Sequence, residues 1–197
     1  MNKISCATAL VPLRAHFDIL VAGDGEKAIL EALRDDAPAL IDADDPASPL
    51  FLTDGDLDAL PLPARHLINL ASYQYSLGGR PATNVIAQLG CPFGCGFCGG
   101  RASPSFRRVR RRSIGRIIEE LAALREAYGY RAYMFQDDEL NVTADVIPLM
   151  HAIRRGAPVV LRGFVKAQLL TAAQATAMAE AGMQEVLIGF ESASDRI

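Results

Sequence analysis

The chain has 197 residues, a net charge of −3 at pH 7 and a composition in which half of the residues are apolar. This is enough to bury the core of one or two domains, and the acidic balance gives no general electrostatic attraction to nucleic acid. No apolar run approaches the roughly 20 residues of a membrane span, and no secretory signal opens the chain. With only four cysteines, we expect a cytoplasmic protein without a disulfide framework.

The N-terminal part predicts a strand and a helix around a glycine turn. Phe17–Ala22 is an apolar run typical of a buried strand, residues 23–26 (GDGE) form a tight turn, and Lys27–Leu33 fits a helix. A glycine turn in this position can bind a phosphate, but a single Gly-x-Gly is weak support for that. The proline-punctuated stretch Leu57–Ala64 predicts a linker.

A glycine-rich loop with three cysteines is the most informative segment. Thr83–Leu89 predicts a strand that leads into it, and Cys91, Cys95 and Cys98 follow with three and then two residues between them. Glycine tolerates backbone angles that other residues avoid, so the loop can fold tightly enough to point three thiolates at one centre. Three thiolates without a fourth suit an iron–sulfur cluster that leaves one iron open.

Other uses of these cysteines fit less well. A structural zinc site is normally closed by four ligands, but Cys6 is far away and the three histidines have no ligand-like spacing. A ferredoxin-type carrier would present a fourth cysteine after another short interval. The pattern favours a three-cysteine iron–sulfur site, with zinc or a purely structural loop as the alternatives.

An arginine-rich stretch, Arg107–Arg112, follows the loop. It invites an RNA-binding interpretation. The stretch lacks interleaved aromatic residues beyond Phe106, and the chain is acidic. We therefore expect a solvated segment that leads into the next helix, with one arginine lying over the cysteine loop.

Strands and helices alternate in the remainder of the chain. Ser113 is placed to cap a helix that stops near Gly129, and Thr171 is placed to cap another. A βαβα order calls for a parallel sheet with outer helices, which right-handed crossovers curl toward a barrel. Three helices are expected: one from Ser113 to Gly129, one over Ala144–Arg155 and one from Thr171 to Ala181. The expected strands are Tyr130–Phe135, Pro158–Val165 and Glu185–Phe190.

Polar residues follow each expected strand. The cysteine loop, residues 136–139 (QDDE), the stretch 162–168 and the turn Glu191–Ser194 all lie at or near strand ends. In barrels of parallel strands the active site lies at the C-terminal ends of the strands. We therefore expect these groups to share one polar rim.

The three cysteines, with Phe97 just before the last one, resemble the cluster loop of the radical S-adenosylmethionine (SAM) superfamily. The resemblance implies that Cys91, Cys95 and Cys98 hold a 4Fe–4S cluster whose fourth iron binds SAM. It implies reductive cleavage of SAM to a 5′-deoxyadenosyl radical, with a reductant such as flavodoxin or ferredoxin. It also implies an α/β fold with part of a (β/α)6 TIM-like barrel, of which this chain would contain the first four βα units.

The resemblance extends to residues that would bind SAM. The Phe97 backbone would lie near the adenine, the turn after the second strand would bind the ammonium group, and Glu191 or Ser192 would bond the ribose. The alternative to SAM binding is helix capping for the acidic and serine residues of these turns, and exposure to solvent for Lys166. The expected cofactor-binding residues are Phe97, Gln136, Asp137, Asp138, Lys166, Glu191 and Ser192.

Other segments resemble the branch of this superfamily that is associated with cobalamin. Arg162–Thr171 and Gly189–Ser194 look like its third and fourth strand segments, and the N-terminal strand, turn and helix resemble the end of a Rossmann-like cobalamin-binding domain. The cobalt-ligating motif Asp-x-His-x-x-Gly is absent. The expected domains are a remnant of that type at 1–56, a linker at 57–82 and a radical SAM core at 83–197, incomplete at its C-terminus; the chain is predicted to be a fragment.

The predicted function is therefore that of a radical SAM enzyme, with cobalamin-dependent methyl transfer to carbon as the reaction of the branch. A methylthiotransferase or cyclase-type radical SAM enzyme is one alternative. An iron–sulfur electron carrier or an inactive fragment is the other. The substrate class, a small molecule or a peptide, is left open.

Overall fold

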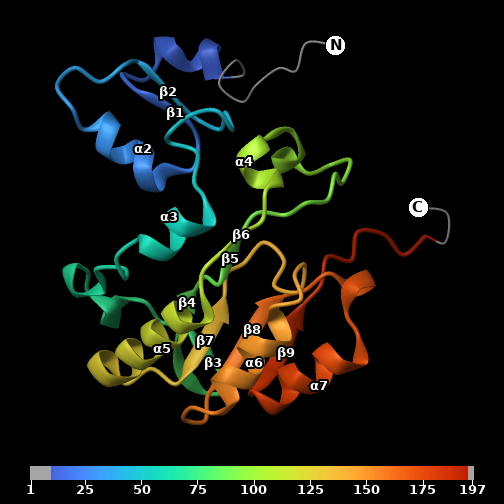
Figure 1. Ribbon diagram of the computed structural model, residues 1–197. Coiled ribbons are helices and arrows are strands. Elements are labelled where there is room, and N and C mark those ends of the chain that lie inside the picture. The colour runs from blue at the N-terminus through green and yellow to red at the C-terminus, as the bar shows by residue number, and fades with distance from the viewer. Residues whose placement is uncertain (1–9, 195–197) are drawn as a thin grey trace. The chain divides into compact units, whose positions relative to one another are not determined.

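The computed structural model describes residues 10–194 (Figure 1), so Cys6 lies outside the described residues. The chain divides into two compact units. One consists of residues 1–59 and 89–111, and the other of residues 60–88 and 112–197. The cysteine loop therefore groups with N-terminal residues, although in the sequence it lies between two strands of the second unit.

The first unit contains a parallel βαβ arrangement. Strands β1 and β2 pair in parallel with Leu20 opposite Leu40, and the core between them and α2 is formed by Ala28, Ile41 and Ala43. The predicted N-terminal strand and helix are present with shifted bounds, whereas β2 and α3 were not predicted. The elements are η1 (Val11–Ala15), β1 (Leu20–Gly23), α2 (Gly25–Ala32), β2 (Leu40–Ala43), α3 (Asp54–Ala59), η4 (Gly99–Ala102), α4 (Pro104–Arg107) and β6 (Arg110–Arg111).

The second unit contains the main sheet, an open sheet of five strands in the order β3-β4-β7-β8-β9. Strand β3 is antiparallel to β4, and the other neighbours are parallel. This confirms the predicted α/β class with a curled, partial-barrel sheet. Its elements are η2 (Arg65–Leu67), η3 (Leu70–Ser72), β3 (Ser76–Leu77), β4 (Arg80–Val85), α5 (Ile114–Tyr128), β7 (Ala132–Phe135), α6 (Val146–Arg154), β8 (Val160–Phe164), η5 (Ala167–Leu169), α7 (Ala172–Glu180) and β9 (Met183–Leu187).

Local signals explain the helices of this unit. The Ser113 hydroxyl accepts a hydrogen bond from the Arg116 amide at the start of α5, and Gly129 ends it with φ of +74°, a conformation that favours glycine. At the start of α7, Thr171 and Gln174 form a capping box. These caps agree with the helix boundaries that the sequence predicts.

The sheet presents different residues on its two faces. Tyr133, Phe135 and Leu161 belong to the large apolar core shared with α5, α6 and α7, and Figure 1 shows these helices alongside the strands. Ala132 and Met134 alternate with them and form a smaller cluster on the other face with Val160 and Leu77. This alternation is the period of two expected of a strand that is buried on both sides.

The first and last strands predicted for the sheet end several residues earlier than expected. The strand predicted over 83–89 begins at Arg80 and ends at Val85, while residues 88–89 form β5 (Gln88–Leu89), which pairs with β6 in a separate two-stranded sheet. The last strand ends at Leu187 rather than Phe190. Apolar runs continued past both ends, so hydrophobicity alone could not place them.

Candidate functional site

The cysteine loop lies in the first unit. Cys91, Cys95 and Cys98 are partly exposed, and none of them forms a disulfide. The Cys91 amide donates to the Phe106 carbonyl at 2.8 Å, which closes the base of the loop. Gly90, with φ of +92°, lies so close to the Arg108 carbonyl that an added Cβ would be 2.2 Å from its oxygen. Only glycine permits this approach.

Two arginines lie beside this loop. A Cβ built on Gly94 would be 3.2 Å from Nη1 of Arg107, and one on Gly96 would be 3.8 Å from Nη1 of Arg101. The position of Arg107 therefore agrees with the expectation that one arginine lies next to the cysteine loop. Positive charge in this position suits an anionic metal–thiolate group.

The loop fits a 4Fe–4S cluster in its donor chemistry. It offers three thiols on a short, glycine-rich segment, all accessible and none oxidised to a disulfide. Within residues 10–194, no group of three or more His, Cys, Asp or Glu side chains is gathered so as to hold a metal ion. Ligation of a cluster by Cys91, Cys95 and Cys98 therefore stays a prediction.

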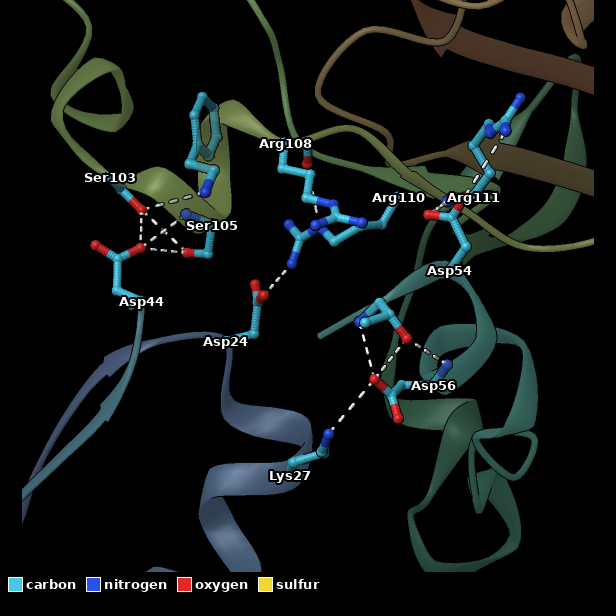
Figure 2. A network of polar contacts seen from close by, with 12 residues as sticks. Asp24, Lys27, Asp44, Asp54, Asp56, Ser103, Ser105, Arg108, Arg110 and Arg111 are labelled. Atoms are coloured by element: carbon cyan, nitrogen blue, oxygen red, sulfur yellow. Dashed lines mark hydrogen bonds and ion pairs between the residues drawn. The ribbon is translucent and has the colours of Figure 1, made fainter. Parts of the chain in front are cut away.

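Three arginines of the stretch after the loop form ion pairs, and two of these pairs correct one expectation. Arg110 is 1% exposed and pairs with Asp24, and Arg111 pairs with Asp54 at 3.7 Å (Figure 2). In the second unit, Arg112 pairs with the buried Glu120 at 2.6 Å. The interpretation of the stretch as solvated is wrong for Arg110 and Arg112, whose side chains are largely buried and paired with acidic residues. It is right for Arg108 and Arg111, which are exposed.

The second unit collects polar residues at the carboxyl ends of its parallel strands. The turn after β7 contains Gln136 and Asp138, which are exposed, and Asp137, which is 1% exposed. The Asp137 carboxylate accepts the amides of Ala87 at 3.2 Å and Gln88 at 2.6 Å. Burial raises the pKa of Asp137 to about 7, outweighing the opposite effect of these two N–H donors.

The end of β8 is held by a residue that the sequence did not single out. Asn141 accepts the Lys166 amide at 2.8 Å and donates to the Lys166 carbonyl at 3.2 Å. Burial raises the pKa of Glu139, while Lys166 lowers it and Asp138 raises it. Asn141 is 2% exposed, but a single asparagine in a turn gives no sequence signal of such a role.

Glu191 and Ser192 follow β9. Glu191 is exposed, and the Ser192 hydroxyl accepts the Ser194 amide at 3.0 Å. The structure thus brings Gln136, Asp138 and Lys166 to the ends of neighbouring strands, β7 and β8, with Glu191 and Ser192 beyond the next strand. Phe97 belongs to the first unit, on the cysteine loop, and is 71% exposed. Contacts of all these residues with SAM stay predictions.

The chain belongs to the radical SAM superfamily. The model of this family, described as the radical SAM superfamily, matches residues 85–197, a range that includes the cysteine loop and the strands after it. The 4Fe–4S cluster and SAM are the cofactors of this superfamily, so the expectation of these cofactors is confirmed at the level of the family.

Two curated relatives carry the name methyltransferase. An uncharacterized methyltransferase of Pyrococcus horikoshii is 32% identical over 145 residues, which cover 72% of this chain and 31% of the relative. Cytidylyl-2-hydroxyethylphosphonate methyltransferase of Streptomyces wedmorensis is 32% identical over 110 residues, which cover 51% of this chain and 20% of the relative. The chain thus spans between a fifth and a third of the length of these relatives.

Solved structures share the fold. TsrM of Kitasatospora setae, a radical SAM methyltransferase with cobalamin and a [4Fe-4S] cluster bound, matches with a TM-score of 0.53 at 20% identity, over 59% of this chain and 24% of that one. OxsB, a cobalamin-dependent SAM radical enzyme, matches with a TM-score of 0.50 at 16% identity, over 58% of this chain and 19% of OxsB. These likenesses confirm the predicted fold.

Within residues 10–194, no helix has both the length and the apolar character that crossing a membrane requires.

Proposed function

We propose that this chain is the cluster-binding and SAM-binding part of a radical SAM methyltransferase. The observation that carries the proposal is the loop of Cys91, Cys95 and Cys98 within a stretch that matches the family model. When bound, the cluster and SAM supply the reductive cleavage that generates a 5′-deoxyadenosyl radical. An external reductant such as flavodoxin or ferredoxin would deliver the electron.

The protein's own residues would bind and orient the cofactors. Cys91, Cys95 and Cys98 would ligate three irons, and Arg107 would offset the negative charge of the cluster. The Phe97 backbone would lie near the adenine. Gln136 and Asp138 are exposed at the end of β7, where side-chain and backbone oxygens can accept hydrogen bonds from an ammonium group.

The remaining predicted contacts come from the ends of the next two strands. Lys166 would pair with the SAM carboxylate, and Glu191 or Ser192 would bond the ribose hydroxyls. The Lys166 backbone is already fixed by two hydrogen bonds to Asn141, which limits how far this residue can move. Asp137 contributes to the same turn, although its carboxylate is occupied by backbone amides.

Methyl transfer to carbon is the proposed reaction because both relatives are named methyltransferases. The two structural neighbours bind cobalamin. The βαβ part of the first unit is proposed as the remnant of a cobalamin-type domain at 1–56, joined by the linker 57–82 to the core at 83–197. The sequence lacks Asp-x-His-x-x-Gly, so we assign no residue to cobalt. A small molecule or peptide as substrate, no nucleic acid partner and a cytoplasmic location complete the proposal.

The test is anaerobic reconstitution with iron and sulfide, followed by incubation with SAM and dithionite. Formation of 5′-deoxyadenosine by the wild type, and its loss in Cys95→Ala, would support the proposal. A cluster that forms without any cleavage of SAM would contradict it and favour the electron-carrier alternative. Bound zinc in place of iron after expression and reconstitution would overturn the iron–sulfur assignment.

A further inference from the structure

Two buried aspartates bind the backbone at the two ends of the cysteine loop. Before the loop, both oxygens of Asp137 accept backbone amides, Oδ2 from Ala87 at 3.2 Å and Oδ1 from Gln88 at 2.6 Å. After the loop, a single oxygen of Asp44 accepts three hydrogen bonds (Figure 2). Asp44 and Asp137 are each 1% exposed.

The hydrogen bonds described for the Asp44 carboxylate come from a short segment just beyond the cysteines. Its Oδ1 accepts the Ser105 amide at 2.9 Å, the Ser105 hydroxyl at 2.6 Å and the Ser103 hydroxyl at 2.6 Å. The Ser103 hydroxyl in turn caps α4 by accepting the Phe106 amide at 3.2 Å. One carboxylate therefore fixes the start of the helix that follows the loop.

These contacts lie close to the cysteines in the sequence. Cys91 follows Gln88 by three residues, and Ser103 follows Cys98 by five. Each set of hydrogen bonds restricts the backbone on its own side of the cysteines, and this reduces the conformational entropy that the segment must lose when its side chains converge on one centre. Hydrogen bonds to a buried carboxyl group are strong enough to do this.

We infer that Asp44 and Asp137 are positioning residues that fix the two ends of the cysteine loop before any cluster is bound, so that the three thiols are presented together. Asp44 follows β2 and Asp137 follows β7, so the two ends of the loop depend on different parts of the fold. The effect of the two aspartates on cluster binding rests on the proposed function. Their effect on the order of the loop ends is independent of it.

The chain supplies a matched control for each aspartate. Asp45 and Asp138 are the next residues in the sequence, have the same side chain and are exposed. The Asp45 carboxylate accepts only the nearby Ala47 amide among the hydrogen bonds described, at 2.9 Å. Substitutions at Asp45 and Asp138 therefore remove the same side chain without removing the contacts of Asp44 and Asp137 to the loop ends.

The first experiment measures amide hydrogen exchange in the cluster-free full chain. Asp137→Ala should speed exchange at Ala87 and Gln88, and Asp44→Ala should speed exchange at Ser105, by roughly tenfold or more, because each variant loses hydrogen bonds to a buried carboxyl group. Asp45→Ala and Asp138→Ala should leave these rates as in the wild type. Equal rates in all five proteins would overturn the inference.

Asparagine variants sharpen the experiment and remain useful if an alanine variant does not fold. Asp44→Asn keeps the single oxygen that the native contacts use, so exchange at Ser105 should stay near the wild-type rate. Asp137→Asn keeps only one of the two oxygens in use, so exchange at Ala87 or Gln88 should still rise. Faster exchange at Ser105 in Asp44→Asn, together with unchanged exchange at Ala87 and Gln88 in Asp137→Asn, would contradict the geometry on which the inference depends.

The second experiment measures iron and sulfide per chain after reconstitution, and the spectrum of the reduced cluster. Asp44→Ala and Asp137→Ala should lose at least about half of the bound iron, a change of order RT in the free energy of cluster binding, while the two control variants keep it. Unchanged iron and spectra in both alanine variants would overturn the role in presenting the thiols. Absence of a cluster in the wild type itself would instead contradict the proposed function, and the exchange rates would still decide whether the aspartates order the loop ends.

Discussion

Arg110 and Asp24 form a buried ion pair in the first unit. The Arg110 side chain is 1% exposed, its guanidinium pairs with the Asp24 carboxylate, and its Nε donates to the Arg108 carbonyl at 3.1 Å (Figure 2). Asp24 lies in the turn between β1 and α2, so this pair connects the segment after the cysteine loop to the βαβ part of the unit. A charge buried in this way is costly unless it is paired.

Removing the partner of Arg110 should destabilise the protein strongly. We expect Asp24→Ala to lower the free energy of unfolding by about 3–5 kcal/mol, because an unpaired arginine would stay buried. Asp54→Ala, which removes the exposed partner of Arg111, should cost less than about 1 kcal/mol. Urea unfolding followed by circular dichroism measures both values, and equal losses would show that the Arg110 pair is not buried in solution.

Glu120 offers a second comparison, within one helix. Its carboxylate is paired with Arg112 at 2.6 Å and Arg65 at 3.2 Å and is almost fully buried, whereas the neighbouring Glu119 pairs with Arg116 on the exposed surface. Glu120→Ala should lower the free energy of unfolding by about 3–5 kcal/mol.

Glu119→Ala is the matched control and should change the free energy of unfolding by less than about 1 kcal/mol. Both variants can be measured in the same denaturant series. A loss for Glu119→Ala as large as that for Glu120→Ala would contradict the buried arrangement of two arginines around one carboxylate.

Gly90 should be essential for the shape of the cysteine loop. In Gly90→Ala the new Cβ would meet the Arg108 carbonyl, and φ of +92° is strained for alanine, so the start of the loop must move. We expect this variant to bind much less iron after reconstitution. Gly99→Ala is the control, because apart from its own local backbone and chain neighbours nothing lies within 4 Å of a Cβ at that position. Full iron binding by Gly90→Ala would show that the loop does not need this close approach.

Asp137 should make stability depend on pH. Its pKa is raised to about 7 from an ordinary value of 3.8, so the folded protein binds a proton more readily than the unfolded chain between these values. The contribution of this group to stability should therefore be greatest at acidic pH and should decline as the pH rises from about 4 to about 7.

The measurement is the free energy of unfolding at pH 5 and pH 8 for the wild type, Asp137→Asn and Asp138→Asn. The difference between wild type and Asp137→Asn should change with pH, while the wild type and Asp138→Asn should run in parallel. A difference between wild type and Asp137→Asn that does not vary with pH would place the pKa of this carboxyl near its ordinary value.

Features encoded locally could be predicted from the sequence. The ends of α5 follow from Ser113 and Gly129, the start of α7 follows from Thr171, and the spacing of the three cysteines indicates the family. In each case the residues that carry the signal lie within a few positions of the feature that they define.

Features that join distant residues could not be predicted. Asp44 and Ser105 are separated by 61 positions, Asp24 and Arg110 by 86, and Asp137 and Gln88 by 49. A buried carboxylate and a surface one look the same in a sequence, because burial depends on which segments pack around them. The burial of Arg110 within the arginine-rich stretch could not be predicted for this reason.

The central claim is that Cys91, Cys95 and Cys98 hold a 4Fe–4S cluster with one iron open to SAM. Electron paramagnetic resonance of the reconstituted and reduced protein, recorded with and without SAM, tests it most directly. We expect a 4Fe–4S signal that shifts on addition of SAM, is lost in alanine variants of the three cysteines and is kept in Cys6→Ala. A signal that ignores SAM, or one that is lost only in Cys6→Ala, would contradict the account.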